Sequence, residues 1–195
     1  MRTIVSGLLA SLLLLGSLPS SANQLELKAM APDHVGLTVR KSPVLYFYIS
    51  QATSRPILFT PVDSRRFIPP LYEGYLPSPT RPGYVAIRLE DLHIMLEEGI
   101  QYPWFVSVYV MRDLAHPVIV AGGVIERVDS RSIDYDHYDR PCDNDSVRLA
   151  AKGGFWYDAM ACLNELIEAN PQDRSFPRMR EELLRQVGII LPTAN

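Results

Sequence analysis

The residues of this chain that could do chemistry are few and are spread along the sequence. Cys142 follows His137 by five positions, an order that would suit a thiol nucleophile beside a base. Closeness in sequence does not establish that geometry, and no third residue is placed to orient the histidine. The other histidines, His34, His93 and His116, lack the spacing that brings two of them to one metal ion. The pattern therefore predicts no catalytic residue, and we expect a protein that is not an enzyme.

An acidic connector over residues 129–145 offers oxygen ligands of the kind that calcium prefers. Its candidates are Asp134, Asp136 and Asp139. The connector lacks the glycine and the closing glutamate of an EF-hand loop, so these three aspartates are weak metal candidates. A solvated run of charge is the simpler interpretation. We predict no cofactor.

Cys142 and Cys162 are the two cysteines of the chain. In an oxidising compartment such a pair often closes into a disulfide, which here would tie the connector to a helix. Two reduced thiols, with Cys162 filling an apolar helix face, are the alternative. The sequence leaves both open.

Residues 1–22 have the plan of a cleaved export signal. One basic residue, Arg2, precedes an apolar stretch over residues 4–18, and small residues lead up to Ala22. The stretch is short for a membrane span, which needs about 20 apolar residues. We expect cleavage after Ala22 and a periplasmic or secreted protein; an uncleaved anchor is the alternative.

The charge of the chain argues against nucleic acid as a partner. The formal net charge is −3 at pH 7, and the basic residues form no patch that a phosphate backbone would require. The expected partner is an envelope protein of unknown identity, and no membrane span is expected after signal cleavage.

Residues 23–128 predict an immunoglobulin-like antiparallel β-sandwich. Apolar residues alternate with period two in short runs separated by proline, glycine and charge. Leu96, Gly99 and Tyr102 have the spacing of a tyrosine corner, and Trp104 follows on the strand face that should point inward. The strands are expected at residues 44–49, 56–62, 84–89, 104–111 and 118–128, with two further candidates at 36–39 and 71–76.

Residues 146–195 predict a helical segment, which makes the fold class α+β. Helices are expected at 146–152, with Asp145 as the cap, at 155–169, and from Ser175 to about residue 188. The first two have the spacing of a tetratricopeptide-like hairpin, which cannot bury both its faces without a partner. Trp156 and Tyr157 are the expected contact residues, whereas Asp158 is expected on the face that points away.

Several short blocks together resemble the bacterial Domain of Unknown Function 928 family. The resemblance spans nearly the whole chain after residue 22, and its most specific parts are the aromatic block that begins at Phe155 and the Tyr102-x-Trp104 corner. It implies an exported protein and carries over no catalytic residues. The blocks are Ala31-Pro32, Gly36-Leu37-Thr38, Ser42-Pro43, Tyr46-Phe47-Tyr48, Pro82-Gly83, and residues 96–104, 121–128 and 155–159.

Two functional hypotheses follow from the sequence. The first is an exported, non-enzymatic protein-interaction or structural module whose helices brace the sandwich or present Trp156, Tyr157 and the acidic connector to a partner. The second is an envelope enzyme, or a protein that binds a small ligand or metal, using a pocket between sandwich and helices. Convergent polar groups in such a pocket would favour the second hypothesis.

Overall fold

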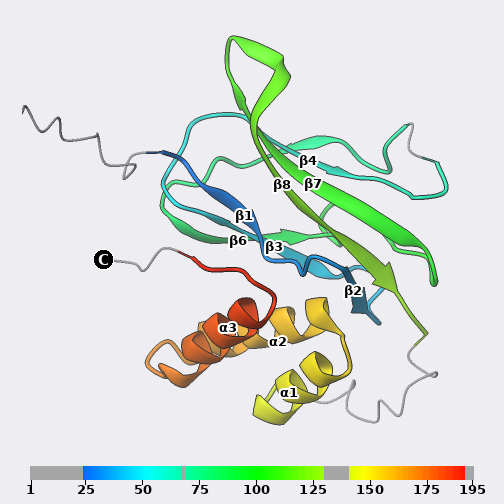
Figure 1. Ribbon diagram of the computed structural model, residues 1–195, viewed down its shortest axis with the longest axis vertical. Helices are drawn as coiled ribbons and strands as arrows, with labels where there is room; N and C mark the ends of the chain where they lie inside the picture. Colours follow the sequence, from blue (N-terminus) through cyan, green and yellow to red (C-terminus); the bar gives the residue numbers. More distant parts are fainter. Residues whose placement is uncertain (1–23, 67–68, 130–140, 192–195) are drawn as a thin grey trace, which may run out of the picture.

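The protein has three layers: a five-stranded sheet, a three-stranded sheet and a layer of helices (Figure 1). This computed structural model describes residues 24–66, 69–129 and 141–191. The two sheets share one hydrophobic core, so they form a β-sandwich, and the fold class is α+β as the sequence predicts. The predicted export signal, His137 and the three candidate metal-binding aspartates lie outside the described residues.

The three-stranded sheet has the order β1-β3-β6, all antiparallel. The five-stranded sheet has the order β2-β8-β7-β4-β5, in which β2 runs parallel to β8 and the other pairs are antiparallel. The chain therefore changes sheets between β1 and β2. The strands are β1 (Leu27–Ala29), β2 (Val35–Thr38), β3 (Val44–Ile49), β4 (Ile57–Pro61), β5 (Gly74–Leu76), β6 (Gly83–Arg88), β7 (Gln101–Val110) and β8 (Asp113–Arg127).

Alternation along the strands sets the two faces of the sandwich, because successive side chains of a strand point to opposite sides. On β7, Trp104, Val106 and Val108 are fully buried between the sheets, whereas Phe105 on the opposite face is 41% exposed. On β3 both faces are buried, since the strand lies between the other sheet and the helices. The seven predicted runs all correspond to strands; β1 was not anticipated, and β8 begins at Asp113, five residues earlier than expected.

The helices are α1 (Asn144–Lys152), α2 (Trp156–Ala169) and α3 (Ser175–Gln186). The helix cap predicted at Asp145 is wrong: Asp143 caps α1, and its carboxylate accepts a hydrogen bond of 2.7 Å from the Ser146 N–H. At α3 the cap position is Arg174 rather than Ser175, and the side chain of Asp173 accepts from the Ser175 N–H instead.

The centre of the helical layer is α2, which contacts both other helices as well as strands β2 and β3. Its first nine residues are all buried, because the sandwich covers one side of the helix and α1 and α3 cover the others. No helix in the described part of the chain has the length and apolar character needed to cross a membrane.

Candidate functional site: the junction between sandwich and helices

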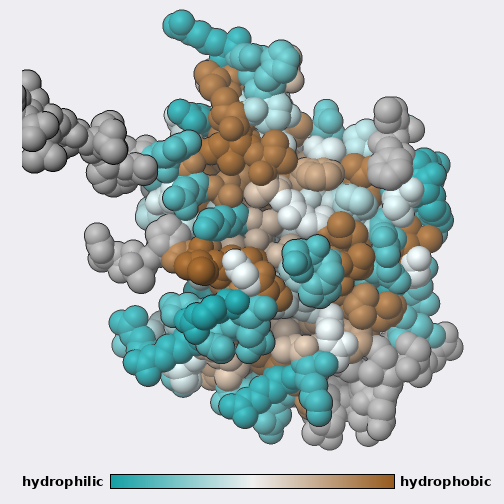
Figure 2. Space-filling model, viewed as in Figure 1, coloured by the Kyte–Doolittle hydropathy of each residue, from teal (hydrophilic) through white to brown (hydrophobic). Residues whose placement is uncertain are grey.

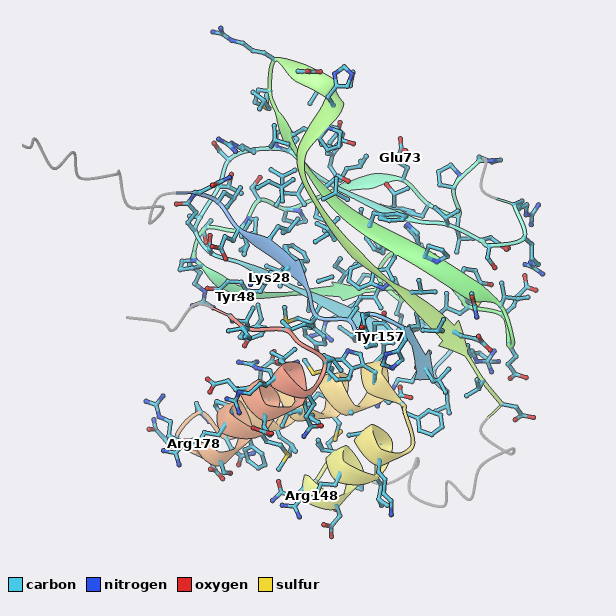
Figure 3. All side chains as sticks on the ribbon, viewed as in Figure 1. Lys28, Tyr48, Glu73, Arg148, Tyr157 and Arg178 are labelled. Atoms are coloured by element: carbon cyan, nitrogen blue, oxygen red, sulfur yellow. The ribbon has the colours of Figure 1, made fainter. Side chains whose placement is uncertain are left out.

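The first turn of α2 packs an aromatic side chain against strands β2, β7 and β8 of the five-stranded sheet. Tyr157 is 1% exposed, and Figure 3 shows it where α2 meets the sandwich. The Trp104 Nε1–H donates to its hydroxyl at 2.9 Å, and that hydroxyl donates to the Val124 carbonyl at 3.1 Å. The hydroxyl is thus both acceptor and donor, which satisfies two buried groups of the five-stranded sheet. Burial raises the pKa of Tyr157, so its proton stays in place at neutral pH.

Two glycines make the space that the Tyr157 ring occupies. A Cβ atom on Gly36 of β2 would lie 2.7 Å from the ring carbon Cε2 of Tyr157. A Cβ on Gly123 of β8 would lie 2.4 Å from the Cβ of Ala31 and 3.2 Å from the Tyr157 hydroxyl. All three distances are shorter than normal van der Waals contact, so a larger residue at either position would displace the helix or the strand.

Trp156 fastens the same turn to the chain between β1 and β2. Its indole N–H donates to the Met30 carbonyl at 2.8 Å, and the side chain is 8% exposed. Trp156 and Tyr157 therefore brace the protein's own sandwich, and little of either residue is open to a partner. The sequence left open whether Trp156 and Tyr157 brace the sandwich or contact a partner, and the contacts in the structure are those of a brace.

Asp158 lies in the junction as well, and the expectation that it faces away is wrong. Asp158 is 3% exposed, and its carboxylate accepts hydrogen bonds from the Thr38 hydroxyl at 2.8 Å and from the Val39 N–H at 2.9 Å. The Arg40 Nε lies 3.6 Å from the same carboxylate. The helical wheel could not show this, because α2 is buried on more than one face and the end of β2 supplies the polar partners.

The tyrosine corner is formed at the opposite end of β7 from its hairpin. Tyr102 is 2% exposed, and its hydroxyl accepts a hydrogen bond of 3.1 Å from the Glu97 N–H, five residues upstream. Burial raises the pKa of Tyr102. Tyr102 and Trp104 thus have structural positions, one at the sandwich edge and one in the core.

The carboxylates beside the corner hold loops together. Glu97 and Asp63 both bind the guanidinium of Arg65, and Glu98 binds Arg127 at 2.6 Å. The hydrogen bonds from Arg65 lower the pKa of Asp63 to about 2 and also lower the pKa of Glu97. The ion pairs of Arg65 join the loop after β4 to the loop before β7, and the lowered pKa values of Asp63 and Glu97 keep both of these carboxylates ionised at neutral pH.

The two cysteines lie close together but are separate thiols in this structure. Cys142 precedes α1, Cys162 lies on α2, and a hydrogen bond between their side chains affects both pKa values. Burial raises the pKa of each thiol, and the Cys142 Sγ also donates to the Glu165 carboxylate at 3.2 Å. The fold therefore brings together the pair that the sequence proposed as a disulfide, without deciding whether it is bridged.

Within the described ranges, no three histidine, cysteine or acidic side chains are grouped so as to hold a metal ion. The polar groups at the junction instead bond to one another. Gly36, Thr38 and Gly123 belong to this site but were not predicted as site residues. They did stand in the sequence blocks that carry the family resemblance, yet nothing local connects them with Tyr157, which lies far away along the chain.

These features define an α+β protein in which a β-sandwich is joined to a helical layer by a buried polar network. The blocks that meet at this network are those quoted above for the family resemblance. The chain belongs to the Domain of Unknown Function (DUF928) family, whose profile matches residues 16–191. The search of curated proteins found no match.

Among solved structures, the chain is similar to fibronectin(III)-like modules of CbhA from Clostridium thermocellum. The match has 12% sequence identity and a TM-score of 0.28, and it covers 53% of this chain and 98% of the other. The β-sandwich is defined by the strand order of its two sheets and by the core that they share.

Proposed function

We propose that this protein is an exported, non-enzymatic interaction module that docks on another envelope protein through a β-hairpin arm. The arm comprises residues 109–120, where the end of β7 and the start of β8 extend past the other strands. The supporting observation is the row of exposed apolar side chains that this arm carries. Export is inferred from the plan of residues 1–22.

The arm projects from the sandwich in Figure 1 and bears apolar surface in Figure 2. Met111 is 69% exposed, Leu114 52%, Val118 50% and Val120 51%. Phe105, farther down β7, extends the apolar surface onto the outer face of the sheet. Soluble proteins seldom leave such a group of apolar side chains together in water unless it meets a partner.

The chemistry of the arm favours a protein partner over lipid. Arg112 and Asp113 occupy the tip, and burying these charges in hydrocarbon would be costly. Pairing by strand addition is also disfavoured, because Pro117 has no N–H to offer and the register shifts beside Tyr109. The partner we expect is a protein with an apolar groove that takes the apolar side chains of the arm, Met111 included, and leaves Arg112 and Asp113 in water.

A non-catalytic role is supported by how the polar residues of the junction are used. The hydroxyl of Tyr157 and the carboxylate of Asp158 are both buried and hydrogen-bonded within the protein. In this proposal α1 and α2 form a tetratricopeptide-like hairpin that braces its own sandwich. The spacing of Gly154, Ala159 and Leu163 and the packing of α1 on α2 support that likeness.

Site-specific photo-crosslinking in the native cell tests the arm. A photoreactive phenylalanine analogue at position 111 should give a discrete adduct with one protein, because Met111 would lie in the interface. Adding Leu114→Ser and Val120→Ser should reduce the adduct about tenfold, since apolar contact area is lost. The readout is the adduct band per unit of folded protein.

Position 95 is the matched control, because Met95 is 70% exposed and precedes β7 at the end away from the arm. The probe there should give no such adduct. Equal adducts from positions 95 and 111, or an adduct that the two serine substitutions leave unchanged, would refute docking through the arm.

A further inference from the structure

A cavity of about 570 Å³ lies between α3, the segment that follows it and the three-stranded sheet. Its volume falls in the range of small-molecule sites. The sequence left open a ligand pocket between sandwich and helices, and this cavity lies at that boundary, away from the arm. Its walls combine Tyr48 and Tyr84 with Leu184 and Ile189, and Arg180 contributes positive charge.

Arg180 is held in place by the protein but lacks a carboxylate partner. Its guanidinium carbon lies 3.5 Å from the centroid of the Tyr84 ring, and one terminal nitrogen donates to the side-chain oxygen of the buried Asn164. Its Nε is buried with no hydrogen-bond partner. Among the described residues it forms no ion pair; the guanidinium is also hydrogen-bonded to the Tyr84 side chain, and Nε is the nitrogen left without a partner.

The environment of Arg180 favours an anion. Burial lowers the pKa of this guanidinium, which means that its charge is poorly solvated. Lys28 brings a second cation to the same side, because its Nζ donates to the Ile190 carbonyl at 2.6 Å (Figure 3). Glu181 also lines the cavity, and its negative charge raises the pKa of Arg180 against the larger effect of burial.

The rest of the cavity wall is aromatic and aliphatic, which suits a ligand with a flat, apolar ring system. The rings of Tyr48 and Tyr84 meet edge to face with centroids 5.7 Å apart, which leaves ring surface beside the aliphatic side chains that follow α3. Because α3 is anchored by Leu184, which is 1% exposed, this wall is in place before any ligand arrives.

We propose that this cavity binds a small organic carboxylate with a flat apolar body. The guanidinium of Arg180 receives the carboxylate as a charge-assisted hydrogen-bond donor, and Tyr48 and Ile189 contact the body. The site is independent of the arm, so the protein could bind a ligand and a partner at once.

The experiment compares 2-naphthoate with 2-naphthylmethanol, which has the same ring system but no charge. Each is titrated to millimolar concentration into the isotope-labelled full chain, and backbone amide shifts are recorded. Naphthoate should shift the amides of residues 83–84 and 189–191, and the neutral alcohol should bind at least about tenfold more weakly, as expected for loss of one charged hydrogen bond.

The variant Arg180→Met should remove that preference, so that the two compounds bind equally weakly. Arg178→Met is the matched control: Arg178 is exposed on the same helix, does not line this cavity and should leave binding unchanged. If Arg180→Met does not fold, the relative affinity of the wild-type protein for 2-naphthoate and 2-naphthylmethanol still tests the proposal. Equal binding of both compounds to the wild type, shifts confined to other residues, or no shift with naphthoate would overturn the proposal.

Discussion

At the scale of single residues, Tyr157 is where packing and hydrogen bonding combine. Its ring fits a space bounded by Gly36 and Gly123, and its hydroxyl satisfies Trp104 and the Val124 carbonyl. Removing only the hydroxyl would leave the packing intact but strand a buried indole N–H. Unsatisfied buried donors are more costly than the average net value of a hydrogen bond.

We therefore expect Tyr157→Phe to lower the free energy of unfolding by about 1–3 kcal/mol. Urea denaturation followed by circular dichroism measures it. Tyr75→Phe is the control, because Tyr75 is 60% exposed, and it should change stability by less than about 0.5 kcal/mol. If the two variants lose the same stability, the buried hydroxyl has no special role.

At the scale of elements, a disulfide between two neighbouring thiols would tie the start of the helical layer to α2. Cys142 stands just before α1 and Cys162 lies within α2, so a bridge would close residues 142–162 into a loop. The raised pKa values of both thiols mean that little thiolate is present near neutral pH. Disulfide formation proceeds through thiol–disulfide exchange, in which the thiolate is the reacting species. We therefore expect oxidation of Cys142 and Cys162 to be slow near neutral pH and to accelerate as the pH rises.

Incubation with oxidised glutathione should convert two titratable thiols into none and raise the free energy of unfolding by about 3 kcal/mol, as the loop-entropy relation gives for a loop of this size. The measurements are thiol titration after unfolding and urea denaturation. Cys142→Ser should abolish the gain. Two free thiols remaining after prolonged oxidation would exclude the bridge.

At the scale of the whole molecule, the three-stranded sheet is the middle layer and needs cover on both sides. β3 shows this directly, since Leu45 and Phe47 are buried and so is Tyr46 on the opposite face. Burial raises the pKa of Tyr46 to about 12. The helices are thus part of the core of this protein and cannot be treated as an appendage.

A chain that ends at residue 128 should therefore fail to fold cooperatively, because the helix-facing side of β3 and the space for Tyr157 would be open to water. We expect a broad urea transition, loss of the near-ultraviolet circular dichroism signal and binding of a hydrophobic dye. The intact chain is the reference. A sharp transition with the midpoint of the intact chain would show that the sandwich is independent of its helices.

Much of the local structure could be predicted from sequence. Alternating apolar residues identify the strands and the inward face of β7, including Trp104. The tyrosine corner could be read because its partners, Glu97 and Tyr102, are five residues apart. Glycine and proline likewise marked the helix ends to within a few residues.

The junction could not be predicted in the same way. Tyr157 meets Gly36 and Trp104, and Asp158 meets Thr38, across separations of 53 to 121 residues. The exposed arm could not be predicted for a related reason. The exposure of Met111 depends on how far β7 and β8 extend beyond the neighbouring strands, and no local sequence pattern gives the lengths of strands elsewhere in the sheet.

The sequence by itself determined the elements of this protein, because period, turn residues and short-range hydrogen bonds are encoded within a few positions. Only the tertiary structure decided that Asp158 is buried, that the two thiols are neighbours, and that Arg180 lies on Tyr84 beside a cavity. The physical reason is that burial and charge depend on which distant segments pack together, and that packing is a property of the folded chain.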